Sequence, residues 1–293
     1  MGKRSPLISV VVPTKGRPRY LRGCLSALAA AKYPRESFEV VVVNDGGGLE
    51  VQQIASSFGE RMDVRLIKPD RTGPSAARNA GAAAGRGRYL AFTDDDCEPT
   101  PGWLRELQRG LEENPGSAVG GETCNGAAQA AAAASQIVID AVHAQFNRDR
   151  SSPRFFASYN LAFPTEPYLA LGGFDERFRY AEDREMCERW VGSGRRFVHA
   201  PGALVFHMRR LTLREFMGQH YGYGRGAAAF HRSRAPGQPR RSDRAGVLRA
   251  LTREAVRGDR NRNRARIAAY LVLSQLATAA GIGRQSISRI LRS

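Results

Sequence analysis

The chain has 293 residues, enough for one large α/β domain or for one domain with an extension, and 42% apolar residues suit an ordinary globular core. Its formal net charge of +17 lies almost wholly in the last third, where residues 204–293 hold 19 arginines, no lysine and four acidic residues, a net charge of +15. This asymmetry excludes a uniformly basic protein and indicates a near-neutral body followed by an Arg-rich region suited to phosphate-bearing partners, either anionic lipid or nucleic acid.

The four cysteines are scattered, with neither a CxxC pair nor metal-ligand spacing, which argues against a disulfide framework and favours a reducing cytosol. The N-terminal residues run straight into a predicted strand without a small-residue cleavage site, so we expect no signal peptide. The longest apolar stretch, residues 267–282, is short of the roughly 20 residues that a membrane span needs. It predicts an amphipathic or core helix, with contact to a membrane left open.

Short β-branched runs alternate with helical patterns through the first third of the chain. Strands are predicted at Ile8–Val12, Glu39–Val43, Val64–Ile67 and Tyr89–Thr93, and helices at Arg19–Ala31, Leu49–Phe58 and Ser75–Ala84. This alternation predicts right-handed βαβ units and a mostly parallel sheet. Ligands of such sheets bind beyond the carboxyl ends of the strands, where Asp45 and Asp94–Asp96 fall, so we expect these acids to converge.

The elements are less regular after residue 100. Helices are predicted at 103–111 and 181–191, an Ala-rich segment at 127–144, and strands at 118–121, 158–163 and 203–206. Two prolines and a glycine make 232–244 a predicted linker, and 246–293 is predicted to form two basic helices. We therefore expect a body at residues 1–210 and an Arg-rich helical extension at 211–293.

Three consecutive acids, Asp94-Asp95-Asp96, follow the fourth predicted strand. Packed side by side they repel one another, and a divalent cation relieves this repulsion, because Mg²⁺ and Mn²⁺ prefer oxygen ligands and leave positions for substrate phosphates. Alternate residues of an extended segment face the same side, so Asp94 and Asp96 are expected to face one site. The alternative interpretation is a solvated acidic turn.

Further candidates each have a structural alternative. Asp45, before three glycines, suits a base or ribose but also suits an Asn-Asp-Gly turn. Arg78 suits a phosphate, or the pair Asp94 and Asp96, but also suits the surface of an amphipathic helix. Glu182 and Asp183 suit a general base taking a hydroxyl proton, or a carboxylate pair favoured by the helix dipole. His207 follows the last predicted strand and suits either a cation or a structural role.

Six of these segments, in order over about residues 7–210, resemble glycosyltransferase family 2, the inverting family with the GT-A fold. They are Val10–Thr14 with Arg17, Val43–Gly46, Ala77–Gly81, Phe92–Asp96, Gly172–Asp175 and Glu182-Asp183. The resemblance implies an α/β class with a Rossmann-like, mostly parallel sheet flanked by helices, followed here by the basic helical extension.

The resemblance also implies roles for individual residues. Asp183 matches the catalytic base, with Glu182 beside it, and Asp96, Asp94 and His207 match positions that bind Mn²⁺ or Mg²⁺. The nucleotide-sugar site is implied at Pro13, Thr14, Arg17, Asp45, Arg78, Asp94 and Asp95, and the acceptor wall at Gly173, Phe174 and Asp175. The implied reaction is a single displacement at the anomeric carbon of a nucleoside-diphosphate sugar, with inversion and an oxocarbenium-like transition state.

The sequence departs from the processive members of this family, because it lacks their late QxxRW-type motif and has its Arg189-Trp190 dipeptide just after Glu182-Asp183. We therefore expect single transfers to a glycan, lipid or small-molecule hydroxyl. UDP is the commonest donor nucleotide in such a family, although GDP and dTDP also occur.

Two other functions remain to be weighed against transfer. Two prolines after the first strand disfavour the phosphate-cradling loop of a nucleotidyltransferase. A catalytically inactive body with a basic binding tail is the alternative, but no nucleic-acid module is recognised, so we expect no nucleic-acid partner. The tail is interpreted either as a surface for anionic membrane, which would place a cytoplasmic protein at the inner face of the cell membrane, or as basic helices packed on the core.

Overall fold

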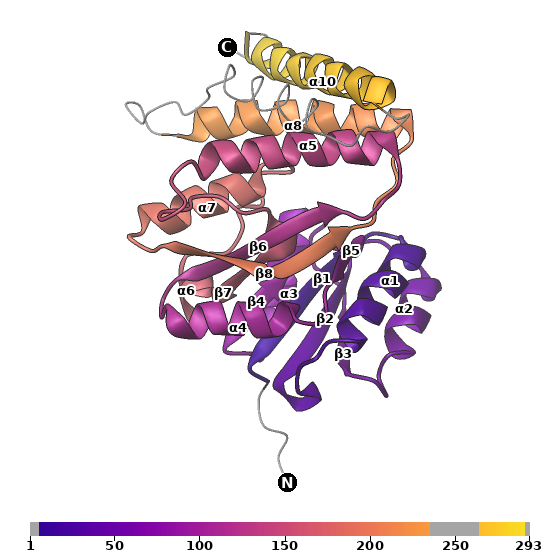
Figure 1. The fold of residues 1–293 in the computed structure, drawn as a ribbon, viewed down its shortest axis with the longest axis vertical. Coiled ribbons are helices and arrows are strands. Elements are labelled where there is room, and N and C mark those ends of the chain that lie inside the picture. The colour runs from indigo at the N-terminus through magenta and orange to yellow at the C-terminus, as the bar shows by residue number, and fades with distance from the viewer. Residues whose placement is uncertain (1–5, 235–263, 291–293) are drawn as a thin grey trace. The chain divides into compact units, whose positions relative to one another are not determined.

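The computed structural model describes residues 6–234 and 264–290, which form two compact units (Figure 1). The first unit contains Met1–Cys124, Arg150–Arg177 and Asp183–Met208. The second contains Asn125–Asp149, Phe178–Glu182 and Arg209–Ser293. The boundary at residue 210, which the sequence suggests between a body and an Arg-rich helical extension, stays a prediction.

An eight-stranded sheet is the framework of the first unit, in the order β3-β2-β1-β4-β7-β6-β8-β5. Its strands are β1 (Ile8–Thr14), β2 (Phe38–Asn44), β3 (Asp63–Ile67), β4 (Tyr89–Phe92), β5 (Cys97–Pro99), β6 (Ala118–Asn125), β7 (Leu161–Pro164) and β8 (Phe197–His207). Strands β3, β2, β1 and β4 are parallel, whereas β7 is antiparallel to β4 and to β6, and β5 is antiparallel to β8. The mostly parallel half is the one that the sequence predicted.

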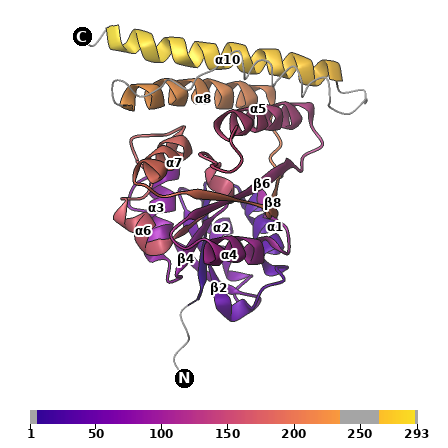
Figure 2. The ribbon, with the colours of Figure 1, turned by 60° about the vertical axis from the view of Figure 1, so that its left-hand side comes forward.

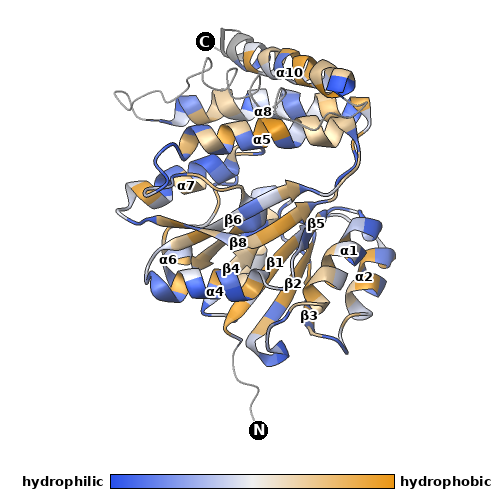
Figure 3. Ribbon diagram, in the orientation of Figure 1, coloured by the Kyte–Doolittle hydropathy of each residue, from blue (hydrophilic) through white to orange (hydrophobic). Residues whose placement is uncertain are grey.

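Both faces of this sheet are covered, which explains why the central strands β1, β2 and β4 are mostly apolar and almost entirely buried (Figure 3). The helices of the first unit are α1 (Pro18–Ala29), α2 (Leu49–Ser56), α3 (Pro74–Ala84), α4 (Trp103–Glu113), α6 (Thr165–Ala170) and α7 (Glu182–Gly192). Val10 and Val12 of β1 pack in one core with side chains of α1, α2 and α4. Val11 points to the other face, where a Cβ on Gly81 of α3 would overlap its side chain, so glycine lets α3 lie close to the sheet.

Three helices make up the described core of the second unit: α5 (Ala130–Phe146), α8 (Leu213–Ser233) and α10 (Arg264–Ile290) (Figure 2). Helix α8 begins with a capping box in which Thr212 and Glu215 satisfy each other's backbone N–H groups. Helices α8 and α10 pack very closely, because a Cβ on Gly224 would overlap the Thr278 carbonyl oxygen and one on Gly281 would overlap that of Tyr221.

The structure corrects several sequence predictions. Residues 158–160 form a 3₁₀ turn before β7 rather than the start of a strand, and β8 begins at Phe197, so that His199 lies inside it. Helix α8 and the short elements β5 and α6 were not predicted, because glycines interrupt the sequence of α8 and the other two elements are only three and six residues long. Of the predicted linker 232–244 and the two basic helices, residues 235–263 lie outside the described part of the chain, and α10 is the helix described after them.

Candidate active site

The candidate site lies at the carboxyl ends of β1, β2 and β4. Because β1 lies between the other two strands, Thr14 at its end bridges Asp45 and the acid run. The Asp45 N–H donates to the Thr14 carbonyl oxygen at 2.8 Å, and the Thr14 hydroxyl donates to Asp95 Oδ2 at 2.6 Å. The two acidic segments therefore meet at one edge of the sheet, as the parallel strand pattern predicted.

The three aspartates of the acid run have different partners. Asp94 accepts a 2.7 Å bond from Arg78 Nη2, Asp95 is fully buried against Thr14 and Arg17, and Asp96 accepts a 2.5 Å bond from Arg17 Nη1. Asp95 and Asp96 lie in a turn rather than in an extended segment, and that Asp94 and Asp96 face one site stays a prediction. Arg17 and Arg78 reduce the repulsion among these acids.

Arg17, which is partly exposed, forms an ion pair with the buried Asp95. Burial raises the pKa of Asp95 to about 7, against the attraction of Arg17 and the hydrogen bond from Thr14, which both favour the ionised carboxylate. Burial alone would lower the pKa of Arg17, but attraction by Asp96 and Asp95 raises it overall. In this arrangement Asp95 fixes the positions of Thr14 and Arg17, which border the rest of the site.

Asp96 and His207 can together hold a divalent cation. The β5–β8 register pairs Cys97 with His207, which brings His207 Nε2 to 3.4 Å from Asp96 Oδ1, and Tyr159 stacks on the imidazole at 5.5 Å. Ligand atoms of Asp96, Cys97 and His207 all lie within 4.8 Å of one another. Burial raises the pKa of the Cys97 thiol, and sulfur is a poor ligand for hard ions, so the carboxylate and the imidazole are the donors that fit Mn²⁺ or Mg²⁺.

Asp45 presents an acceptor without a partner. Its Oδ2 accepts a 3.2 Å bond from the Gly73 N–H and lies 3.6 Å from Lys15 Nζ. Its Oδ1 is buried and has no hydrogen-bond partner among the described residues. A buried carboxylate oxygen is stabilised by a donor, and the hydroxyl of a ribose or the N–H of a base supplies one.

Arg78 connects the acid run to the opposite wall of the site. Its guanidinium is buried, bonds to Asp94, and lies over the Phe174 ring at 5.7 Å from the ring centroid. This pairing is one of the two that the sequence suggested for Arg78. It rules out the alternative of a surface arginine on an amphipathic helix.

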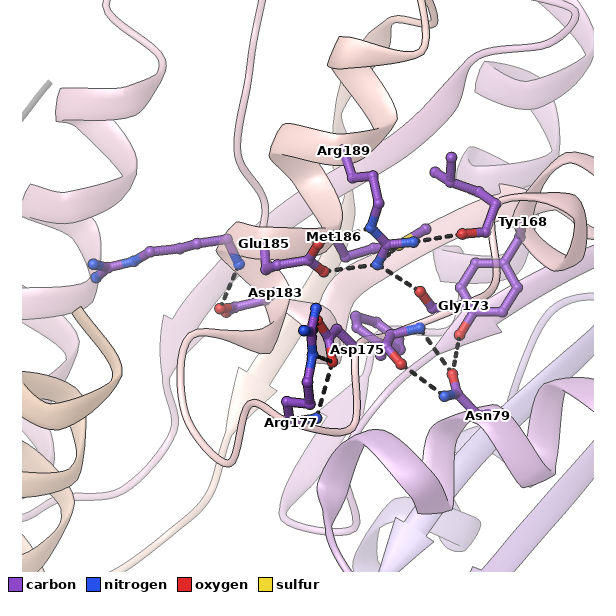
Figure 4. Close-up of polar contacts among 12 residues, drawn as sticks. Asn79, Tyr168, Gly173, Asp175, Arg177, Asp183, Glu185, Met186 and Arg189 are labelled. Carbon is purple, nitrogen blue, oxygen red and sulfur yellow. Dashed lines mark hydrogen bonds and ion pairs between the residues drawn. The ribbon is translucent and has the colours of Figure 1, made fainter. Parts of the chain in front are cut away.

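Asp183 lies in the first turn of α7. Its Oδ1 accepts a 2.8 Å bond from the Arg184 N–H (Figure 4), and the residue before Glu182, Ala181, has a φ of 64°, which a non-glycine residue seldom adopts. Burial raises the pKa of Asp183, while the charges of Arg184 and Arg78 lower it. A carboxylate with a raised pKa, close to an arginine of the donor-side wall, has the character of a general base.

The predicted acceptor wall, Gly173 to Asp175, is held from two helices (Figure 4). From α3, the Asn79 side-chain oxygen accepts bonds from the Phe174 N–H at 2.8 Å and the Tyr168 hydroxyl at 3.0 Å, and its nitrogen donates to the Phe174 carbonyl at 2.8 Å. Gly173 has a φ of 66°, and a Cβ there would overlap Asn79. Asp175 pairs with the exposed Arg177, which lowers the pKa of the carboxyl group.

From α7, Arg189 holds the same turn. Its guanidinium donates to the carbonyl oxygens of Leu171 at 2.5 Å and Gly173 at 2.7 Å, and is itself held by Glu185. Sequence reasoning missed Asn79 and Arg189 as members of the site. Asn79 follows Arg78 in a segment already singled out, and Arg189 belongs to the Arg-Trp dipeptide, so position in the sequence was the available signal.

Known proteins resemble this chain in sequence and in structure. Residues 9–152 match the model of "Glycosyl transferase family 2". The chain is 30% identical over 241 residues to the pre-mycofactocin glycosyltransferase of Mycobacterium tuberculosis, an alignment that covers 75% of this chain and 47% of that protein. It is 34% identical over 116 residues to the glycosyltransferase AglE of Haloferax volcanii, covering 39% of this chain and 37% of AglE.

Solved structures share the fold. A mannosyltransferase of Pyrobaculum calidifontis, in complex with GDP-Man and Mn²⁺, superposes with a TM-score of 0.65 at 17% identity, covering 94% of this chain and 88% of that one. Staphylococcus aureus TarS in complex with UDP-GlcNAc gives 0.57 at 17% identity, covering 92% and 81%. The fold class expected from the sequence, a GT-A sheet flanked by helices with a helical C-terminal region, is confirmed.

These likenesses agree with the order of motifs in the chain and with their position at one edge of the sheet. The chain spans about half the length, or less, of these curated relatives. Residues 9–152 of the chain are a glycosyltransferase family 2 domain.

Proposed function

We propose that this protein transfers a hexose from a nucleoside-diphosphate sugar to an acceptor hydroxyl, one sugar at a time and with inversion, and that it depends on Mn²⁺ or Mg²⁺. The main support is the convergence of Asp45, Arg78, Asp94 and Asp96 at one sheet edge, with His207 3.4 Å from Asp96. Family membership supports the reaction class.

In this proposal the nucleoside lies against Pro13, Thr14 and Asp45. The Oδ1 atom of Asp45, which has no partner in the described part of the chain, accepts a hydrogen bond from the base or ribose. Asp96 and His207 would hold the cation, with Asp94 nearer the ribose. When bound, this ion supplies positive charge opposite the leaving diphosphate. Arg17 donates a hydrogen bond to Asp96 Oδ2 and so keeps this carboxylate in place, while Asp96 Oδ1 faces His207.

Asp183 then takes the proton of the acceptor hydroxyl, with Glu182 beside it. The hydroxyl oxygen forms a bond to the anomeric carbon from the face opposite the diphosphate, whose bond to that carbon breaks, so the configuration inverts. Burial raises the pKa of Asp183 towards the working pH, and a general base takes up a proton most effectively when its pKa lies near that pH. Gly173, Phe174 and Asp175 line the acceptor side.

The donor and the acceptor are proposed by class. Solved structures of the same fold hold UDP-GlcNAc and GDP-Man, and we propose UDP as the donor nucleotide to be tested first. The acceptor is a glycan, lipid or small-molecule hydroxyl and not a nucleic acid. A cytoplasmic enzyme, associated with the inner membrane face through its basic C-terminal region, fits this acceptor range.

The test is a binding and hydrolysis screen of the full chain against UDP-, GDP- and dTDP-sugars, with Mn²⁺, Mg²⁺ or EDTA. The Asp96→Asn and His207→Ala variants are expected to lose metal-dependent donor binding, whereas Asp70→Asn, at an exposed aspartate, serves as the matched control. Donor binding that is unaffected by EDTA and by Asp96→Asn would overturn the metal assignment. Absence of binding to every donor would favour the inactive-body alternative.

A further inference from the structure

The outward face of α10 is apolar, although this helix already packs on α8 and α5 with its other face. Leu271, Ser274, Ala277 and Gly281 are buried, as expected for one side of a packed helix. On the exposed side, Val272 and Leu276 are each 60% exposed. They are joined there by exposed Ala268, Ala269, Ala279 and Ala280. Soluble helices normally carry charges on that side.

These residues form one stripe. At about 100° per residue, the spacing from Ala268 to Ala280 keeps all of them within roughly 60° of the line through Val272 and Leu276. Exposed arginines flank this stripe near its ends, with Arg264 on one side and Arg266 and Arg284 on the other. Figure 3 shows mostly apolar colours along the described part of α10, with a hydrophilic beginning.

The charges on α10 indicate which kind of surface can cover the stripe. Helix α10 has no acidic residue between Arg264 and Ile290, so the surface that covers it must supply negative charge at both ends and apolar contact between them. A second copy of α10 would bring arginine against arginine in either orientation. Residues 235–263 carry eight arginines and three acids, so covering the stripe with them would also add positive charge. An anionic lipid surface supplies both phosphates and acyl chains.

We propose that the stripe formed by Ala268, Ala269, Val272, Leu276, Ala279 and Ala280 is a docking surface for an anionic membrane, with α10 lying in the interface and its arginines at the phosphates. By length and composition Arg264–Gln285 is also able to cross a bilayer. Its contact with α8 argues against crossing, because Gly224 and Gly281 seat the two backbones against each other and α8 carries Arg214, Glu215 and Arg225. This inference concerns the second unit and does not rest on the proposed reaction.

Vesicle co-sedimentation of the full chain tests the surface. The probes are vesicles of phosphatidylcholine with roughly one third phosphatidylglycerol, and vesicles of phosphatidylcholine alone. We expect the unaltered chain to bind the anionic vesicles about tenfold more strongly than the neutral ones at low salt, and to lose this preference at high salt. Equal binding to both vesicles, or binding to neither, would overturn the proposal.

Three variants separate the contributions. Val272→Glu with Leu276→Glu should reduce binding to anionic vesicles at least about tenfold, because two charges enter the apolar contact. Arg266→Glu with Arg284→Glu should remove the preference for anionic lipid. Leu49→Glu, at a position 76% exposed on α2 of the first unit, is the matched control and should bind like the unaltered chain.

Two results would assign the stripe to another occupant. If Val272→Glu with Leu276→Glu lowers the Tm and leaves vesicle binding intact, the stripe is covered by residues of this chain, and the proposal fails. If the unaltered chain elutes as a dimer and this variant as a monomer, without an effect on vesicles, the occupant is a second copy. A loss of vesicle binding with unchanged Tm, circular dichroism and elution volume supports the membrane.

Discussion

The side chain of Asn79 should be one of the strongest determinants of stability at the site. Asn79→Ala removes three hydrogen bonds, one to the Tyr168 hydroxyl and two to the backbone of Phe174. A neutral hydrogen bond contributes about 1 kcal/mol net, so the expected loss in the free energy of unfolding is about 3 kcal/mol. Urea unfolding of the full chain, followed by tryptophan fluorescence, measures it.

Two other variants calibrate this value. Tyr168→Phe removes only one of the three bonds and leaves the Asn79 oxygen paired with the Phe174 N–H, so we expect a loss of about 1 kcal/mol. Asn114→Ala removes a single bond to the Gly110 carbonyl in α4, away from the site, and should also lose about 1 kcal/mol. If Asn79→Ala loses no more than these two variants, Asn79 does not hold the turn and the reasoning is refuted.

Three other residues give expected outcomes of different kinds. Glu39 is fully buried and accepts bonds from Ser9, Arg65 and Arg86; burial raises its pKa, but the bonds from Arg86 lower it overall. Glu39→Gln should therefore lower the free energy of unfolding at pH 7 by about 2 kcal/mol, which is less than for a fully buried ion pair because solvent screens the partly exposed arginines. This difference between the variant and the unaltered chain should shrink as the pH falls through the folded pKa of Glu39. Burial lowers the pKa of His220 to about 4. As the pH is lowered, this histidine is therefore protonated in the unfolded chain before it is protonated in the folded chain, and the free energy of unfolding should fall from about pH 6.5 towards pH 4. In His220→Leu this part of the pH profile should disappear from urea titrations, and an unchanged profile would contradict the assignment. Gly224→Ala should lower the Tm because its Cβ meets Thr278, whereas Gly218→Ala in the same helix, with open space around it, should raise the Tm or leave it unchanged.

The sequence predicted the parallel half of the sheet well because that half is built from local, repetitive signals. Val10 to Val12 and Val40 to Val43 are β-branched runs that are buried on both faces, and their strands end at Thr14 and Asn44, next to the site. Parallel topology then brings the carboxyl ends together without further information. Asp45 and Asp94 could therefore be placed at one edge from the sequence alone.

The remaining contacts could not be predicted, because they depend on pairings between distant residues. The separation between Arg17 and Asp96 is 79 residues, and that between Asn79 and Phe174 is 95. The turn at Asp95 and Asp96 agrees with the alternative interpretation of the three acids as a turn, but only the distant partner Arg17 shows how their side chains are held. Helix α8 was missed because its glycines, including Gly224, suggest a loop until the backbone of α10 is seen against them.

The neighbouring residues Arg78 and Asn79 have a consequence for engineering. Arg78 bonds to Asp94 in the acid run, and Asn79 bonds to the backbone of Phe174. One helical turn of α3 therefore determines the geometry of both sides of the site. Grafting the segment 171–177 from a relative would import a new acceptor wall without the side chain that anchors it. A successful exchange of acceptor preference in this scaffold should therefore move the 78–79 pair together with the loop, as a single module.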